Sequence, residues 1–371
     1  MSRVGGDLLR PGGLTRVMGV VNVTPDSFSD GGTYLDPIDA VRAGLRMVDE
    51  GADLIDVGGE STRPGASRVV ASEEMRRVLP VVAELAAAGV TVSVDTTRVS
   101  VAAAAVDAGA VLVNDVSGGV DPDLLAMVAD RGVYYVLMHA RGPSADMTTR
   151  AVYGDVVSEV VAELRARLEV VLAAGIAEDR VILDPGIGFA KAAAHNWALL
   201  GRLDKLSALG RPLLVGTSRK SFLGSVLADQ RGAVRPSEER DDATQATTAL
   251  LAAANVWGVR VHAVRPAADA VRVVRAWQQG SCDDPVLAAG GGGSAGTAAG
   301  AASPPTAGSG SDSASGNASG NGNASGAGAG AGPALPPLIL PSSAPRPPRG
   351  GERPASARGR STGQHTPRFP R

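Results

Sequence analysis

The chain has 371 residues, of which 44% are hydrophobic, and a formal net charge of −2. A slightly acidic chain is a poor electrostatic match for nucleic acid, so we predict no nucleic-acid partner. The single cysteine, Cys282, excludes a disulfide framework, and no apolar run reaches the roughly 18 residues of a membrane span, so we expect no membrane partner and a cytoplasmic location.

Composition divides the chain into three parts. Residues 1–14 read as an N-terminal extension, and residues 15–279 alternate apolar runs with Ala-, Arg- and Glu-rich segments, as one large domain would. Residues 280–371 are rich in Gly, Ala, Ser, Asn, Pro and Arg. Because this last part has too few large apolar side chains to offset the entropy of ordering it, we predict a disordered low-complexity C-terminal tail.

Eight short apolar runs predict β-strands. Each is nearly continuous rather than alternating, which is typical of strands covered on both faces: 17–23, 54–57, 91–94, 111–113, 133–138, 181–183, 212–215 and 258–261. Helical patterns lie between them at 37–50, 72–88, 100–108, 122–130, 155–174, 196–209, 241–257 and 266–278. Asp36 is a predicted N-cap, and Gly89 stands where a C-terminal glycine cap belongs.

This alternation predicts a parallel sheet with right-handed crossovers, and eight units favour an α/β fold of the closed (β/α)8 TIM barrel type. A doubly wound open sheet is the alternative. It would place a glycine-rich dinucleotide turn after the first strand, where this chain reads NVTPDSF.

Polar side chains stand at the carboxyl ends of the predicted strands, which a barrel gathers at one rim. Asp95, Asn114, Asp184 and Lys220 together match a flat heterocycle with an amino-amidine edge and a ring carbonyl. A second group suits a diphosphate, and its asparagine can also give an oxygen to Mg2+: Asn22, Arg63, Arg260 and His262. We therefore expect a substrate with a polar ring and a diphosphate leaving group.

Other polar residues have structural interpretations. Asp115, Asp121 and Asp123 read as turn formers or caps, and His195 as a cap neighbour. His139 reads as a packed rim residue, while Asp56 either braces the GGESTRP loop or belongs to the site. The histidine spacing does not suggest zinc, and neither a Walker loop nor a GxSxG turn is present.

Eight motifs between residues 16 and 278 together closely resemble the dihydropteroate synthase family. They are MGVVNVTPDSFSDGG, DVGGESTRPGA, SVDT, VNDVSGG, LMH, LDPGIGFAK, LLVGTSRKSFLG and RVHAVR. The resemblance implies a TIM barrel that joins 4-aminobenzoate to 6-hydroxymethyl-7,8-dihydropterin diphosphate in folate synthesis, releasing pyrophosphate. It also implies Mg2+ as cofactor, a homodimer, and competition by sulfonamides.

Carried across motif by motif, the resemblance implies specific roles. The pterin would be held by Asp95, Asn114, Met138, Asp184 and Lys220. Asn22 would bind Mg2+, and the diphosphate would lie against Asn22, Arg63, Arg260 and His262. The aminobenzoate would be framed by Phe28, Thr62, Arg63, Pro64, Phe189 and Ser221. The residues closest to the chemistry would be Asn22, Arg63, Asp95, Lys220, Arg260 and His262.

Two departures from the family pattern concern alanines. Ala190 replaces a common glycine and is tolerable only if its φ is not positive, and Ala263 stands where an aspartate is common.

Two rival hypotheses remain: a barrel that acts on methyltetrahydrofolate, and a non-catalytic paralogue. A paralogue would be expected to have lost Asn22, Arg63, Lys220 or His262, and all four are present.

Overall fold

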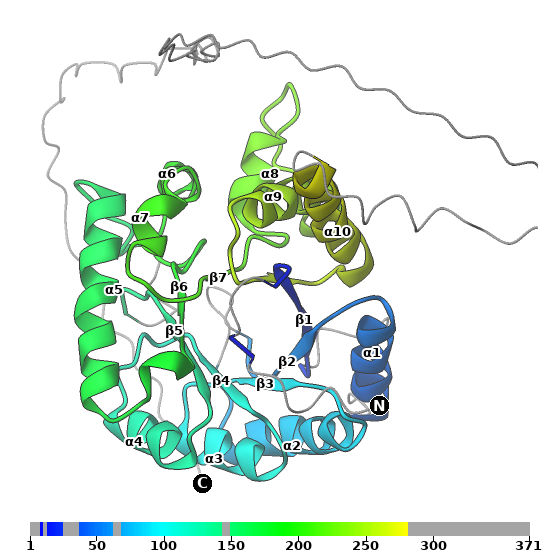
Figure 1. The fold of residues 1–371 in the computed structure, drawn as a ribbon. Helices are drawn as coiled ribbons and strands as arrows, with labels where there is room; N and C mark the ends of the chain where they lie inside the picture. Colours follow the sequence, from blue (N-terminus) through cyan, green and yellow to red (C-terminus); the bar gives the residue numbers. More distant parts are fainter. Residues whose placement is uncertain (1–7, 10–12, 25–36, 62–67, 143–148, 281–371) are drawn as a thin grey trace, which may run out of the picture. The chain divides into compact units, whose positions relative to one another are not determined.

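The strands close into a parallel barrel. A computed structural model describes residues 8–9, 13–24, 37–61, 68–142 and 149–280 (Figure 1). Within them lies one eight-stranded sheet of order β6-β5-β4-β3-β2-β1-β8-β7, and a parallel bridge between Leu183 and Leu213 joins its two edges. The strands are β1 Arg16–Asn22, β2 Leu54–Gly58, β3 Val92–Asp95, β4 Leu112–Asp115, β5 Tyr134–Met138, β6 Val181–Asp184, β7 Leu214–Val215 and β8 Gly258–Val261. The predicted (β/α)8 barrel is confirmed.

Helices surround the barrel, as Figure 1 shows. The described part of the chain contains α1 Pro37–Asp49, α2 Ala71–Ala87, α3 Val99–Asp107, α4 Pro122–Arg131, α5 Val156–Ala173, α6 Ala193–Leu200, α7 Leu203–Ser207, α8 Ser221–Val226, α9 Asp241–Ala253 and α10 Val264–Gly280. None of these helices has the length and apolarity needed to cross a membrane. The predicted tail lies outside the described residues.

Three helix predictions need correction. The single helix predicted over 196–209 is two helices, since the chain turns at Gly201 and Arg202 between α6 and α7. The helix predicted to reach residue 257 ends at Ala253, because Asn255 takes a left-handed φ of 56°. The short helix α8 is not among the eight helical patterns given above. Gly89, with φ of 79° just after α2, fits the predicted glycine cap, whereas Asp36 lies outside the described residues.

Ala190 contradicts the condition set for it. Its φ is 47°, so the alanine occupies the left-handed region that glycine adopts freely. The turn of residues 186–190 also contains Gly186 and Gly188, with φ of 64° and 82°. The chain therefore holds a strained alanine in a tight turn at the rim.

The core has two layers. A large cluster fills the space between sheet and helices, and a smaller one fills the barrel interior with Met18, Leu54, Leu112, Val136, Ile182 and Leu214. The interior cluster also includes Leu8, from the predicted N-terminal extension. Leu8 donates from its N–H to Tyr134 Oη at 3.2 Å, and its carbonyl accepts from Trp257 Nε1 at 3.1 Å. The described part of the extension therefore contributes Leu8 to the barrel core, with Leu9 packed against the same cluster.

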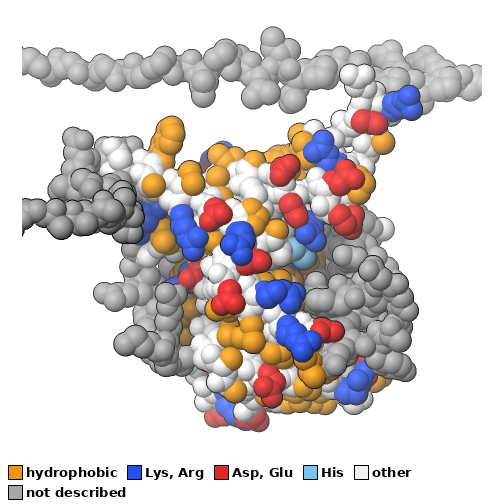
Figure 2. Space-filling model, turned by 90° about the vertical axis from the view of Figure 1, so that its right-hand side faces the viewer, with side chains coloured by type: hydrophobic (Ala, Val, Ile, Leu, Met, Phe, Trp, Pro, Cys, Tyr) orange, Lys and Arg blue, Asp and Glu red, His pale blue; other side chains and the backbone are white. Residues whose placement is uncertain are grey.

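The outer surface carries mixed charge. Figure 2 shows the side of α1 and α10, where basic side chains lie interspersed with acidic ones. Many pairs are close enough to neutralise each other, such as Arg76 with Glu73 and Arg272 with Asp269. This face of the described residues is not the continuous basic surface that nucleic acid requires.

Candidate active site

Strand register aligns the predicted site residues at one end of the barrel. Across the sheet, Asn22 pairs with Gly58, Gly58 with Asp95, and Asp95 with Asn114. Further round, Met138 pairs with Asp184. Asn22, Asp95, Met138 and Asp184 are the last residues of their strands and Asn114 is the last but one, so these side chains start at the carboxyl-end rim of the barrel.

Asp56, at the centre of β2, joins both predicted charge groups. Its side chain is fully buried and accepts from Ser93 Oγ at 2.6 Å, from Asn114 Nδ2 at 2.9 Å and from Arg260 Nε at 2.7 Å. Arg260 Nη2 also donates to Asp95 Oδ2 at 2.8 Å. Asp56 therefore orients one residue from each predicted group, a role that the sequence had left open.

Lys220 and Asp184 form the opposite side of the mouth. The Lys220 ammonium donates to the Ile187 carbonyl and lies 5.0 Å from the centroid of the Phe189 ring. A Cβ placed on Gly216 would lie 3.6 Å from both Lys220 Nζ and Arg260 Cβ, so the Lys220 ammonium lies near the backbone end of Arg260, whose charge lowers the pKa of Lys220. Asp184 Oδ1 accepts from Gly186 N at 2.7 Å, so the carboxylate also shapes the turn that follows β6.

Burial shifts the proton affinities of these groups. It lowers the pKa of Lys220 to about 8, against the opposing charge of Asp184, and it raises the pKa of Asp184, against the charge of Lys220. Burial also raises the pKa of Asp95 to about 7 despite the neighbouring Arg260. A cluster of buried groups with shifted pKa values in one place is typical of a functional site.

Asn22 lies beside Asp95. A Cβ placed on Gly58 would lie 3.7 Å from Asn22 Oδ1 and 3.8 Å from Asp95 Cγ. Groups of three or more His, Cys, Asp or Glu that could hold a metal do not occur among the described residues. One amide oxygen suits Mg2+ nonetheless, since this ion takes few protein ligands and completes its shell with water and substrate phosphate.

His262 completes the described anion group. Its Nδ1 lies 2.9 Å from Ser218 Oγ, and its backbone N–H donates to the same oxygen at 3.2 Å. Ser218 therefore fixes the orientation of the imidazole.

Some predicted site residues are not placed. Phe28, Thr62, Arg63 and Pro64 lie outside the described residues, so their predicted roles are untested. Ser221 begins α8 and is exposed, and Phe189 is half-buried on the turn after β6.

The residues given structural interpretations behave accordingly. Asp115 accepts from the N–H groups of Ser117 and Gly119, and Asp121 caps α4. His195 Nδ1 accepts from Ala192 N at the start of α6. His139 is buried in a polar cluster that sequence analysis did not detect, because its members come from three separate elements.

The chain is similar to known proteins over most of the barrel. Residues 18–262 match the family described as pterin binding enzyme. The chain is 56% identical to the dihydropteroate synthase of Mycobacterium leprae over 264 residues, which cover 71% of this chain and 93% of that protein.

Solved structures show the same likeness. One is Xanthomonas albilineans dihydropteroate synthase with 4-aminobenzoic acid, at 45% identity and a TM-score of 0.66, covering 71% of this chain and 93% of that one. Another is the same organism's enzyme in complex with 7,8-dihydropteroate, at 43% identity and a TM-score of 0.64, covering 71% and 94%. The resemblance of the motifs, the barrel and these relatives agree: the chain belongs to the pterin-binding enzyme family, and within it to the dihydropteroate synthases.

Proposed function

We propose that this chain condenses 6-hydroxymethyl-7,8-dihydropterin diphosphate with 4-aminobenzoate to give 7,8-dihydropteroate and pyrophosphate. The observation that carries the proposal is the mouth of the barrel. There Asp56 binds Asn114 and Arg260, and Arg260 in turn binds Asp95. Lys220 and Asp184 lie close enough for each to shift the pKa of the other. The mouth thus offers acceptors and donors for a pterin next to cations for a diphosphate.

The pterin ring would be held by hydrogen bonds of both kinds. The carboxylates of Asp95 and Asp184 accept from the amino-amidine edge, while Asn114 and Lys220 donate to ring nitrogen and carbonyl. Met138 is buried at the end of β5 and would pack against the ring. Arg260, within reach of Asp95, would mark the border between pterin and diphosphate.

The reaction then follows from charge. The bond between the methylene carbon and the diphosphate oxygen breaks, and Arg260, His262 and the predicted Arg63 stabilise the negative charge that develops on the diphosphate. The amine of aminobenzoate forms the new C–N bond to this carbon and loses a proton. Phe189 would form one wall of the aminobenzoate site, with Phe28, Thr62, Pro64 and Ser221 as further predicted contacts.

Mg2+ is part of the proposal, with Asn22 as its protein ligand. When bound, the ion would supply additional positive charge to the diphosphate. Addition of a chelator should reduce product formation, and re-addition of Mg2+ should restore it.

A homodimer is the proposed assembly. Exposed apolar side chains on α9 and α10, namely Leu250, Val273 and Trp277, offer a face for a second copy. Sedimentation equilibrium of the full chain tests this, and a monomeric mass would reject it. A cytoplasmic location likewise stays a prediction.

One experiment tests the activity. Purified protein is incubated with the pterin diphosphate, 4-aminobenzoate and Mg2+, and dihydropteroate is measured by chromatography, with omission of aminobenzoate as control. Product above background is expected. Absence of product from folded protein would reject the proposed function.

A further inference from the structure

Lysine is rare in this chain, and its positions are informative. Of 36 basic residues only Lys191, Lys205 and Lys220 are lysines. Lys205 lies exposed on α7, but Lys191 and Lys220 are both near the barrel mouth. Lys220 already has a place in the proposed mechanism, whereas Lys191 has none.

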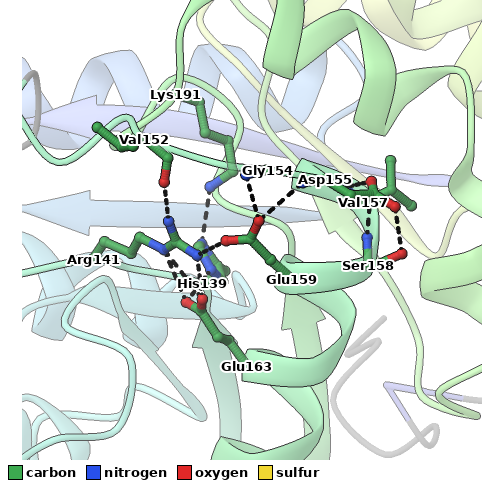
Figure 3. Close-up of polar contacts among 10 residues, drawn as sticks. All are labelled: His139, Arg141, Val152, Gly154, Asp155, Val157, Ser158, Glu159, Glu163 and Lys191. Carbon is green, nitrogen blue, oxygen red and sulfur yellow. Dashed lines mark hydrogen bonds and ion pairs between the residues drawn. The ribbon is translucent and has the colours of Figure 1, made fainter.

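Lys191 folds back over the turn that follows β6. Its side chain is buried, and Nζ lies 2.9 Å from His139 Nδ1 (Figure 3). Nζ also donates to the carbonyl oxygen of Phe189 at 3.1 Å. The contact to Phe189 spans Ala190, the residue with φ of 47°. The hydrogen bond from Lys191 to Phe189 therefore connects the residues on either side of Ala190, whose backbone conformation is strained.

The space around this ammonium is narrow. A Cβ placed on Gly186 would lie 3.4 Å from Lys191 Nζ and 2.2 Å from the His139 carbonyl oxygen. A compact ammonium fits such a site. A planar guanidinium is larger and would need hydrogen-bond acceptors for more N–H groups. This explains a lysine here in a chain that otherwise prefers arginine.

A charge-alternating chain leads from Lys191 to the surface. Since an ammonium can only donate, His139 Nδ1 accepts from Lys191, and its Nε2–H is then left to donate to Glu163 Oε2 at 3.0 Å. Arg141 binds Glu163 and Glu159 on α5 from the other side, as Figure 3 shows. The imidazole thus links a buried cation to a surface carboxylate and holds the cation in place.

The proton affinities fit this assignment. Burial, together with the charge of Lys191, lowers the pKa of His139 to about 4, so the imidazole is neutral at pH 7. Burial lowers the pKa of Lys191 to about 7, opposed by Asp184 and Glu163 and assisted by Lys220 and Arg141. Ammonium and amine are therefore both populated near pH 7, and either form has an N–H that donates to the Phe189 carbonyl. The charge of Lys191 also opposes the rise that burial causes in the pKa of Asp184, so the ammonium favours the charged form of that carboxylate.

We propose that Lys191 is a positioning residue for the turn of residues 186–190. Its ammonium, held by the His139–Glu163 pair, binds the Phe189 carbonyl, keeps Ala190 left-handed, and so fixes Phe189 as a wall for aminobenzoate. This role rests on the proposed function, because it assumes that Phe189 faces that substrate.

The central test is Lys191→Met with steady-state kinetics. We expect the KM for aminobenzoate to rise about tenfold, since a charge-assisted hydrogen bond is lost, while kcat and the dissociation constant of the pterin change less than about threefold. Lys205→Met is the matched control and should leave all three quantities unchanged. An unaltered KM in Lys191→Met would overturn the proposal.

A second substitution separates positioning from other roles. Ala190→Gly in the Lys191→Met background should restore most of the KM, because glycine adopts the left-handed conformation without help. A lysine that acted through its charge or through proton transfer would not be rescued in this way, so failure of the rescue would also overturn the proposal.

A milder variant covers the case in which Lys191→Met does not fold. Lys191→Gln retains a hydrogen-bond donor but lacks the positive charge and the length of lysine. We expect this variant also to raise the KM for aminobenzoate, and Ala190→Gly to lower the KM again. An unchanged KM, or a raised KM that Ala190→Gly does not lower, would count against the role. The wild-type assay comes first: no dihydropteroate from wild type rejects the proposed function, whereas an active wild type with insensitive Lys191 variants rejects only this role.

Discussion

Arg260 Nε donates to Asp56 Oδ2 at 2.7 Å, although 204 positions separate the two residues in the chain. The contact joins β8 to β2 across the barrel interior, and the same carboxylate holds Asn114 from β4. One buried aspartate thereby sets the relative positions of a residue predicted to bind pterin and one predicted to bind diphosphate.

Substitution Asp56→Asn should destabilise the fold and impair the site. An amide cannot accept from Ser93, Asn114 and Arg260 at once, so the half-buried guanidinium of Arg260 keeps only Asp95 as a charged partner. We expect a loss of about 3 kcal/mol in the free energy of unfolding. Urea denaturation measures this. Asp107→Asn, which breaks an exposed pair with Arg131, is the control and should cost less than about 1 kcal/mol. Equal effects in the two variants would contradict the role of Asp56.

Lys220→Ala and Asp184→Asn should each weaken pterin binding. Each change removes one charge of the Lys220–Asp184 pair and leaves the remaining charged side chain buried without its partner. We expect the dissociation constant of the pterin, measured by calorimetry, to rise at least about tenfold in both variants. Lys205→Ala is the control. Normal pterin binding by either variant would mean that the pocket is elsewhere.

The raised pKa of Asp95 predicts a dependence of stability on pH. Because burial raises this pKa from 3.8 to about 7, the folded state binds more protons than the unfolded state between these values. The contribution of Asp95 to the free energy of unfolding therefore falls as pH rises through this window. Asp95→Asn should remove that fall.

Urea denaturation of wild type and Asp95→Asn at about pH 4 and pH 8 measures the effect. The variant should gain stability relative to wild type at the higher pH, and titrating groups far from Asp95 cancel in the difference between the two proteins. A difference that is the same at both pH values would show that Asp95 is not shifted.

Ala190→Gly should stabilise the protein slightly. Relief of a left-handed alanine is worth about 1–2 kcal/mol, and the added freedom of glycine in the unfolded chain offsets about 0.4–1 kcal/mol of it. Thermal denaturation should show a higher melting temperature. Ala83→Gly, at an exposed position within α2, is the matched control and should lower it, because glycine is unfavourable in a helix. A lower melting temperature for Ala190→Gly would contradict the strain.

Leu8→Ala should destabilise the barrel from its N-terminal end. The side chain is only 9% exposed and belongs to the barrel-interior cluster, so we expect a loss of about 2 kcal/mol on chemical denaturation. Leu14→Ala, at a side chain that is 43% exposed, should cost much less. Similar losses would show that Leu8 does not pack as described.

The sequence alone sufficed for the barrel and for the ends of its strands. Continuous apolar runs report burial on both faces, and a polar residue at the end of such a run marks the rim, so Asp95, Asn114, Asp184, Lys220 and His262 could be found locally. The resemblance to a family added their expected substrates. These inferences depend only on residues close together in the chain, because the length of an apolar run and the polar residue that follows it can be seen in the sequence.

Only the tertiary structure shows which distant side chains contact each other. That Asp56 holds Arg260 and Asn114, that Lys191 meets His139, and that Leu8 enters the barrel all depend on strand register and ring closure. The φ of Ala190 likewise follows from the contacts around its turn rather than from its own preference, which opposes it. Such contacts join distant segments, and their geometry is set only when the whole barrel closes and its burial energy holds each segment in place.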